Sequence, residues 1–221
     1  MTVAGNDGGK MASSTAASSI AAGDTTTGET LAPLRRAVDL PRAYRLLNHG
    51  PVVLVSSAHG GRRNVMAASW SMPVDFDPPK VAVVIDKSTL TRELVEASGA
   101  FALNIPLRPL ARATEIVGTE SGRDIDKFAA LGIDTFAADK IAAPLVAGCA
   151  GWLECRVIEE PHNQQAYDLF LAEVVAASAD PVLFSNGRWH FPAGSPRSLH
   201  YIAGGAFFET GEAFSVTDEA S

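Results

Sequence analysis

The chain has 221 residues, of which 47% are hydrophobic, a size and composition suited to one globular domain with a tail. Its formal net charge of −7 argues against a nucleic-acid surface, which requires a basic face. The two cysteines, Cys149 and Cys155, are too few for a disulfide framework, resemble no zinc site, and are expected to be buried and inert. No apolar run is long enough to cross a membrane, so we expect a protein of the reducing cytoplasm.

Residues 1–30 differ from the rest because they are rich in Ala, Ser, Thr and Gly and hold no aromatic residue. Such a segment buries too little apolar surface to offset the entropy of ordering, so it is predicted to be a disordered tail. It is too polar for a signal peptide, and Met11 is a second candidate for the start of translation. The folded domain is expected over 31–214, followed by a polar tail over 215–221.

The predicted elements, in chain order, are mostly strands. Apolar and β-branched runs predict strands, whereas capping residues ahead of mixed sequence predict helices. Asn186-Gly187 between two strand-like runs predicts a tight hairpin, because both residues accept positive φ. Many short strands with few helices predict a closed or nearly closed barrel. Helices are expected over 39–48, 89–97, 110–117 and 124–131, and strands over 52–57, 64–71, 81–85, 101–105, 152–158, 166–176, 182–185 and 188–191.

Residues 121–128, which read SGRDIDKF, are predicted to cradle a phosphate. They begin as a turn and continue as the start of a helix, whose unpaired N–H groups and positive dipole end attract an anion. Gly122 lets the backbone approach closely, and Ser121 adds a hydroxyl group. Arg123 and Lys127 add cationic donors. The alternative is a charged surface helix with a capping serine, and spacing alone favours neither interpretation.

Three segments in this order resemble the flavin reductase-like family, and its flavoredoxin-like members most closely. They are residues 64–70 (NVMAASW), 101–106 (FALNIP) and 121–128 (SGRDIDKF), within a resemblance that runs from about 39 to 211. The resemblance implies a mainly β fold with flanking helices, a split β-barrel that binds FMN. Three segments in order are fairly specific for flavin binding and much less specific for the reaction.

The resemblance also implies roles for the strand that covers 64–70. In the family this strand runs along the isoalloxazine ring, and its main-chain groups meet the polar pyrimidine edge. Small side chains permit that approach, and polar ones can add hydrogen bonds. The alternative is an ordinary strand whose small residues pack on a neighbour. The implied contacts are Asn64, Met66, Ala67, Ala68, Ser69 and Trp70.

A second helix start carries hydroxyl groups on Ser88, Thr89 and Thr91, which the resemblance places near the FMN phosphate or ribityl chain. Simple N-capping is the alternative for each of them. The resemblance places Asn104 near the same part of FMN, whereas its alternative role is to bond local backbone at a strand end. Lys127 is the best side chain for neutralising the phosphate, and a solvated lysine is the alternative.

Several other residues are expected to be structural. Trp152 and Trp189 fit strand packing better than a cofactor site. The five histidines form no Ser/His/Asp or metal-binding spacing, so we expect scattered surface or satisfied side chains at His49, His59, His162, His190 and His200.

Hydride transfer from a nicotinamide to a flavin needs no protein nucleophile, so no catalytic residue and no metal are assigned. The sequence lacks a Rossmann glycine fingerprint, so NADH or NADPH is expected to bind transiently over the flavin. The leading expectation is an NAD(P)H-dependent flavin reductase that forms a homodimer and supplies a monooxygenase or another redox protein. The alternatives are a flavoredoxin-like electron carrier with bound FMN, and a flavin- or haem-binding module for storage or sensing.

Overall fold

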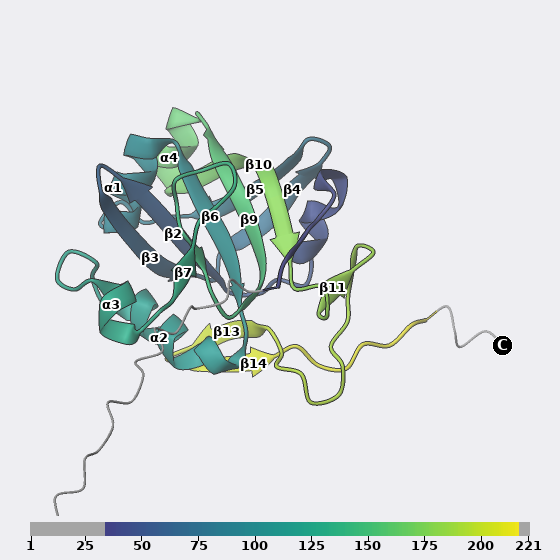
Figure 1. The fold of residues 1–221 in the computed structure, drawn as a ribbon. Helices are drawn as coiled ribbons and strands as arrows, with labels where there is room; N and C mark the ends of the chain where they lie inside the picture. The colour runs from purple at the N-terminus through teal and green to yellow at the C-terminus, as the bar shows by residue number, and fades with distance from the viewer. Residues whose placement is uncertain (1–33, 217–221) are drawn as a thin grey trace, which may run out of the picture. The chain divides into compact units, whose positions relative to one another are not determined.

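A curved antiparallel sheet forms the centre of the fold (Figure 1). A computed structural model describes residues 34–216, so the tail predicted over 1–30 and most of the one over 215–221 lie outside the described residues. The strands follow the spatial order β3-β2-β6-β9-β10-β5-β4, and β1 pairs with β10. These strands are β1 (Arg36–Ala37), β2 (Val53–His59), β3 (Arg62–Ala68), β4 (Ser71–Phe76), β5 (Pro79–Val84), β6 (Ala100–Pro106), β9 (Cys149–Ile158) and β10 (Leu169–Ala179).

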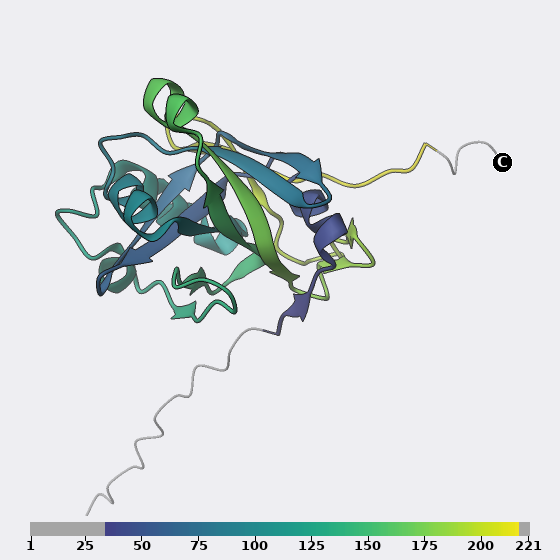
Figure 2. The same cartoon turned by 90° about the horizontal axis from the view of Figure 1, so that it is seen from above.

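The first and last strands of that order, β3 and β4, are consecutive in the sequence. Only Ser69 and Trp70 separate them, so the sheet must curl back until its two ends approach each other (Figure 2). No pairing joins β3 to β4 within residues 34–216, and the barrel therefore stays open along this seam. This is the split β-barrel that the resemblance predicts, mainly β with flanking helices.

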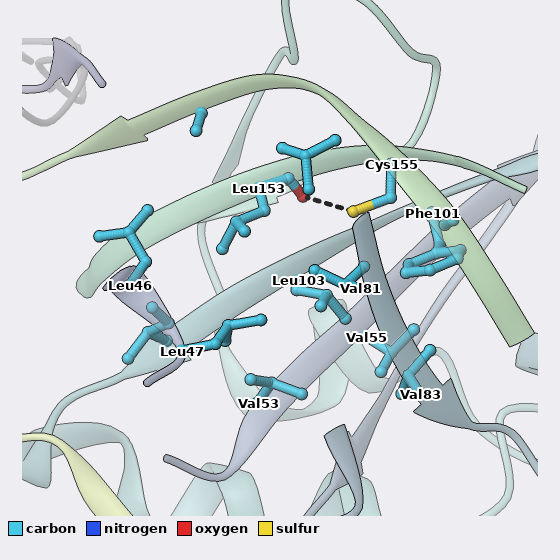
Figure 3. Packing of buried hydrophobic residues seen from close by; sticks show 14 of the residues in the cluster. Leu46, Leu47, Val53, Val55, Val81, Val83, Phe101, Leu103, Leu153 and Cys155 are labelled. Carbon is cyan, nitrogen blue, oxygen red and sulfur yellow. Dashed lines mark hydrogen bonds between the residues drawn. The ribbon is translucent and has the colours of Figure 1, made fainter. Parts of the chain in front are cut away.

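The barrel interior is apolar and is built by alternating residues of several strands (Figure 3). Val53 and Val55 of β2 point inward with Phe101 and Leu103 of β6, because side chains alternate between the two faces of a strand. The intervening residues, such as Leu54, belong to a second cluster on the outer face, under α2 and α3. Burial on both faces explains why β2 and β6 read as continuous apolar runs rather than as alternating patterns.

Short helices and small hairpins surround the sheet. The tight hairpin predicted at Asn186-Gly187 is confirmed, with φ of 52° and 73° at its two central residues. None of the helices in the described part of the chain is long and apolar enough to span a membrane. The helices are η1 (Leu40–Leu46), α1 (Leu90–Ser98), η2 (Arg108–Leu110), α2 (Ala111–Thr119), α3 (Lys127–Leu131) and α4 (Pro161–Tyr167). The remaining strands are β7 (Thr135–Phe136), β8 (Leu145–Val146), β11 (Phe184–Ser185), β12 (Arg188–Trp189), β13 (Leu199–Ala203) and β14 (Ala206–Glu209).

Two predicted elements are present, but with bounds that differ in ways that affect the site. The helix expected over 124–131 begins only at Lys127, because the Asp126 carboxylate caps it by accepting from the N–H groups of Phe128 and Ala129. The strand expected over 64–71 stops at Ala68, where the chain turns from one end of the sheet to the other. Other elements were not expected at all, among them α4, the hairpin β13–β14, the short strands β1, β7 and β8, and β4 beyond Ser71.

Candidate functional site

Two neighbouring cavities lie along β3 on the side of α1 and α2. The first, called here the polar cavity, has a volume of about 260 Å³. The second, the apolar cavity, has a volume of about 390 Å³, and both are lined by Gly118 and Thr119 of α2. The polar cavity is lined by Asn64, Met66, Ser88, Thr89, Leu90, Thr91, Val117, Gly118, Thr119, Glu120, Ser121, Gly122 and Lys127. The apolar cavity is lined by Val52, Ala67, Ser69, Thr114, Glu115, Gly118, Thr119, Tyr201, Gly204, Gly205 and Phe207.

The floor of the polar cavity is a buried contact between β3 and α1. The Asn64 side chain donates from Nδ2 to Thr91 Oγ1 at 2.9 Å, and both residues are buried. Gly122 then lies directly against this amide, since a Cβ added to it would be 2.1 Å from Asn64 Oδ1. Only glycine lets the 121–122 turn come this close to Asn64, whereas the approach of this turn to a phosphate stays a prediction.

Lys127 supplies a cation inside the polar cavity. Its residue is only 4% exposed, and its ammonium donates to the main-chain oxygens of Val65 at 3.0 Å and Val117 at 2.7 Å. An ammonium has three donors, and contacts within residues 34–216 account for two of them. Burial lowers the Lys127 pKa to about 8, and nearby Glu120 opposes that shift, so the group is mostly protonated at neutral pH.

The helix start predicted at Ser88–Thr91 lies at the polar cavity. Thr89 caps α1 by accepting from the Arg92 N–H at 3.1 Å, and the Ser88 hydroxyl donates to Asp86 at 2.6 Å. The first turn of α1 therefore faces the cavity with its positive dipole end. The second predicted helix start does not do this, because α3 begins later and its first N–H groups are taken by Asp126.

Arg123, predicted with Lys127 as a phosphate donor, does not line the polar cavity. It is half exposed and forms an ion pair with Glu93 at 2.8 Å. Glu93 also pairs with Arg62 at 2.9 Å. Since the Glu93 carboxylate already holds it, Arg123 is a rim residue rather than a wall of the cavity.

Asn104 is also absent from the lining of both cavities. It is fully buried in β6, and its amide donates to the Leu54 oxygen at 2.8 Å and to Ser56 Oγ at 3.0 Å. Its own oxygen accepts from the Val146 N–H at 2.8 Å. These contacts reach β2 and Val146, which are distant in the sequence, so they differ from the alternative stated from the sequence, the bonding of local backbone at a strand end. Two other predicted residues, Ala68 and Trp70, line neither cavity either: Ala68 is in the core, and Trp70 is 74% exposed.

The apolar cavity contains residues that the sequence reasoning missed. The helix α2 contributes Thr114 and Glu115, and the hairpin β13–β14 contributes Tyr201 and Phe207, whose ring centroids are 5.3 Å apart. The sequence does carry signals for this hairpin, since Gly204-Gly205 separates two runs that hold aromatic residues, but no strand was predicted there. Helical residues such as Thr114 carried no signal, because only the packing of α2 on β3 turns them toward a cavity.

Two of the five histidines are not scattered. His49 and His200 have ring centroids 5.5 Å apart, and both join a hydrogen-bonded group with Ser198 and Thr210 at the base of the hairpin β13–β14. No group of His, Cys, Asp and Glu within residues 34–216 is arranged to hold a metal ion. Both cysteines are buried, as expected, and burial raises the pKa of each thiol well above its usual range.

The two cavities together suit an elongated ligand with an anion at one end and a planar ring at the other. A buried ammonium and the start of α1 favour a phosphate in the polar cavity. Small Ala67 and an aromatic pair favour a flat apolar group in the adjoining one. The fold defines the chain as a split-barrel protein.

The comparisons with known proteins agree with this class. The model of the flavin reductase like domain matches residues 45–193, and the chain belongs to this family. An uncharacterized protein of Escherichia coli K12, YddH, is 46% identical over 178 residues, which are 79% of this chain and 94% of that protein.

Two solved structures extend the likeness. An FMN-binding domain of a flavin reductases-like enzyme from Shewanella baltica is 48% identical, with a TM-score of 0.81 over 83% of this chain and 98% of that one. Flavoredoxin of Desulfovibrio vulgaris is 26% identical, with a TM-score of 0.66 over 77% of this chain and 92% of its own. The chain is thus a flavin reductase-like protein.

Proposed function

We propose that the chain binds FMN across the polar and apolar cavities and works as an NAD(P)H-dependent flavin reductase. The observation that carries the proposal is Lys127, a buried ammonium with a donor to spare, beside a cavity suited to a flat ring. An isolated buried charge is costly, so its place beside a hydroxyl-lined cavity favours an anionic ligand there. The names of the family and of the Shewanella structure support a flavin as that ligand.

Different residues would contact the phosphate, the ribityl chain and the ring of FMN. Lys127, Ser121 and the Ser88–Thr91 start of α1 would hold the phosphate, with Asn64 and Met66 along the ribityl chain. The Val65 oxygen accepts from Lys127 and so faces the open edge of β3. Main-chain groups repeat this direction every second residue, so those of Ala67 and Ser69 would face the ring. Such donors tune the redox potential of a bound flavin.

Bound FMN would supply the hydride and electron chemistry, and the protein would supply position and exclusion of water. No protein nucleophile is required for this reaction, so no residue is proposed as catalytic. A second candidate function is a flavoredoxin-like electron carrier that holds FMN but uses NAD(P)H poorly. The similarity to the Desulfovibrio flavoredoxin is the observation that favours it.

Two measurements test the proposal. Titration of the flavin-free protein should show tighter binding of FMN than of riboflavin, because only FMN offers a phosphate to Lys127; equal affinities would contradict the assignment. Anaerobic mixing of the FMN-loaded protein with NADH and then with NADPH should bleach the flavin absorbance rapidly. Bleaching only by a reduced protein donor would identify the carrier instead.

We also propose a homodimer, because β4 leaves an apolar stripe uncovered. Trp70, Met72, Val74 and Phe76 are 74%, 58%, 48% and 63% exposed and recur at every second position. A contiguous exposed apolar surface on an edge strand favours a partner surface. Light scattering should give the mass of a dimer at micromolar concentration, and a flavin-loaded monomer would contradict it. A monooxygenase or another redox protein remains the proposed recipient of electrons.

A further inference from the structure

One wall of the apolar cavity comes from the hairpin β13–β14, which lies outside the residues 45–193 that match the family model. Figure 1 shows this hairpin beside α2, apart from the main sheet. Tyr201 and Phe207 stand on its two strands, paired in register, and present an aromatic surface to the cavity. The wall therefore lies beyond the residues that the family model matches.

The hairpin is fixed at its base and at its tip. At the base, the Leu199 oxygen accepts from the Val52 N–H at 2.8 Å, and Leu199 is buried. At the tip, Gly205 comes so close to α2 that an added Cβ would lie 3.0 Å from Glu115 Oε1. An ion pair of 3.0 Å between Arg108 and Glu209 adds a third contact. A wall held at three places can select a ligand by its shape.

The chemistry of the apolar cavity favours an uncharged ring. Among residues 34–216, the one charged residue that lines it is the acid Glu115, which is already paired with Arg112 at 2.9 Å. Thr114 lines the same cavity, is 1% exposed, and its hydroxyl has no hydrogen-bond partner within the described residues. A buried hydroxyl without a partner is unfavourable by itself and is satisfied by a ligand that offers a carbonyl or amide.

We propose that the hairpin β13–β14 selects the second reactant of the flavin, and that this reactant presents an uncharged planar ring with a carbonyl or carboxamide group. The proposal rests on the proposed function, since it places this ring between the flavin on β3 and the pair Tyr201 and Phe207. Two sources share this chemistry. The nicotinamide of NADH would give a hydride, with a proton from solvent, and leave as NAD⁺. A quinone would take two electrons and two protons from reduced FMN and leave as the hydroquinone.

Stopped-flow absorbance of the FMN-loaded protein separates the two sources. The reductive arm uses N-benzyl-1,4-dihydronicotinamide, and the oxidative arm uses p-benzoquinone after reduction with dithionite. Tyr201→Ala and Phe207→Ala should raise the apparent Kd for one of these probes by roughly 3- to 10-fold. The Kd for FMN should change by less than about twofold, and the arm that responds identifies the source.

Thr114→Val removes the hydroxyl and keeps the shape of the side chain. It should raise the same apparent Kd without lowering Tm, because the hydroxyl has no partner in the fold to lose. The matched controls are Phe208→Ala and Ile202→Ala, which lie on the same hairpin, are exposed and do not line the cavity. Neither control should change the apparent Kd for either probe.

Two outcomes overturn the inference. If Tyr201→Ala and Phe207→Ala raise the Kd for FMN as much as they raise the apparent Kd for the probes, the cavity holds only the flavin ring. If they change neither probe, the hairpin does not touch the second reactant. Both outcomes leave the proposed function standing, because that proposal is tested on the unaltered protein, by its preference for FMN over riboflavin and by bleaching with NADH or NADPH.

Discussion

The polar and apolar cavities lie side by side, but their walls are held in different ways. The polar cavity is closed by buried contacts between elements of the family core, such as Asn64 with Thr91 and Lys127 with the Val65 oxygen. The apolar cavity depends on the hairpin β13–β14, which lies beyond residues 45–193 and is joined at its base by a main-chain bond between Val52 and Leu199 and by the hydrogen-bonded side chains around Ser198. The anion end of the groove is thus set by the fold, whereas the ring end can change without disturbing it. The following changes test that difference.

The largest expected effect is on stability, from the loss of the Arg92 contacts that hold α1 in place. The first turn of α1 lines the polar cavity. Arg92 is buried and donates to Asp168 at 2.9 Å, to Glu96 at 2.6 Å and to the Gln164 oxygen at 2.8 Å. Arg92→Ala leaves Asp168 without its partner and should lower the free energy of unfolding by about 3 kcal/mol. Urea denaturation measures this free energy. Arg112→Ala, at an 81% exposed side chain, is the control and should change it by less than about 0.5 kcal/mol.

Lys127→Met should weaken FMN by about 2 kcal/mol, because a charge-assisted contact to the phosphate is lost while the length of the side chain is kept. The affinity for riboflavin should change little, so the ratio of the two Kd values is the measurement. Arg123→Ala is the matched control. Because Arg123 is held by Glu93 on the rim, it should change that ratio by less than about twofold.

The ratio of the Kd values for riboflavin and FMN should also depend on pH. The Lys127 pKa is about 8, so the ammonium carries its charge below that pH and loses it above. The preference for FMN over riboflavin should therefore fall as the pH rises from 7 to 9, and Lys127→Met should abolish this dependence. A preference that stays constant over this range would remove Lys127 from the phosphate site.

Gly122→Ala tests the close approach of the 121–122 turn. An added Cβ would stand 2.1 Å from Asn64 Oδ1, so either the turn or the Asn64–Thr91 contact must shift. We expect a loss of about 1–2 kcal/mol in the free energy of unfolding and weaker FMN binding. Gly118→Ala should have a smaller effect, since its added Cβ would meet only the Ala67 methyl at 3.3 Å. Equal melting curves for both variants would contradict the packing described here.

The base of the hairpin should respond to acid more than the polar cavity does. Burial, with a smaller contribution from His200, lowers the His49 pKa from 6.5 to about 4. Between pH 6.5 and about 4, His49 is protonated in the unfolded chain but mostly neutral in the folded chain. The free energy of unfolding therefore decreases as the pH falls from 6.5 toward 4. Between pH 7 and pH 5 we expect a loss of about 2 kcal/mol that His49→Gln does not show. Chemical denaturation at the two pH values measures it, and equal losses in both proteins would exclude His49.

The sequence predicted much of the fold and of the polar cavity because both depend on local signals. Hydroxyl residues at a helix start, a glycine in a turn and β-branched runs are all readable in one dimension. Asn64, Met66, Ser88–Thr91, Ser121 and Lys127, predicted as contacts of one cofactor, do line one cavity. What they bind stays a prediction.

Other features depended on contacts between distant parts of the chain. Asn104 reads like any amide at a strand end, and only its neighbours in β2 and at Val146 show that it is buried and satisfied. Lys127 was expected as a phosphate donor, but its burial against two main-chain oxygens could not be read from the sequence. The wall formed by Tyr201 and Phe207 exists only because residues 199–209 return to α2.

An open barrel has two free strand edges, and free edges invite pairing with other chains. The edge at β3 is blocked, because the Lys127 ammonium occupies the Val65 oxygen and disfavours an incoming strand. The edge at β4 is interrupted by Pro73 and by a bulge between Pro73 and Asp75, but the exposed side chains of Met72, Val74 and Phe76 leave its face apolar. The same split that leaves room for a ligand therefore leaves one side of the molecule prone to aggregation, and solubility at high concentration should depend on what covers β4.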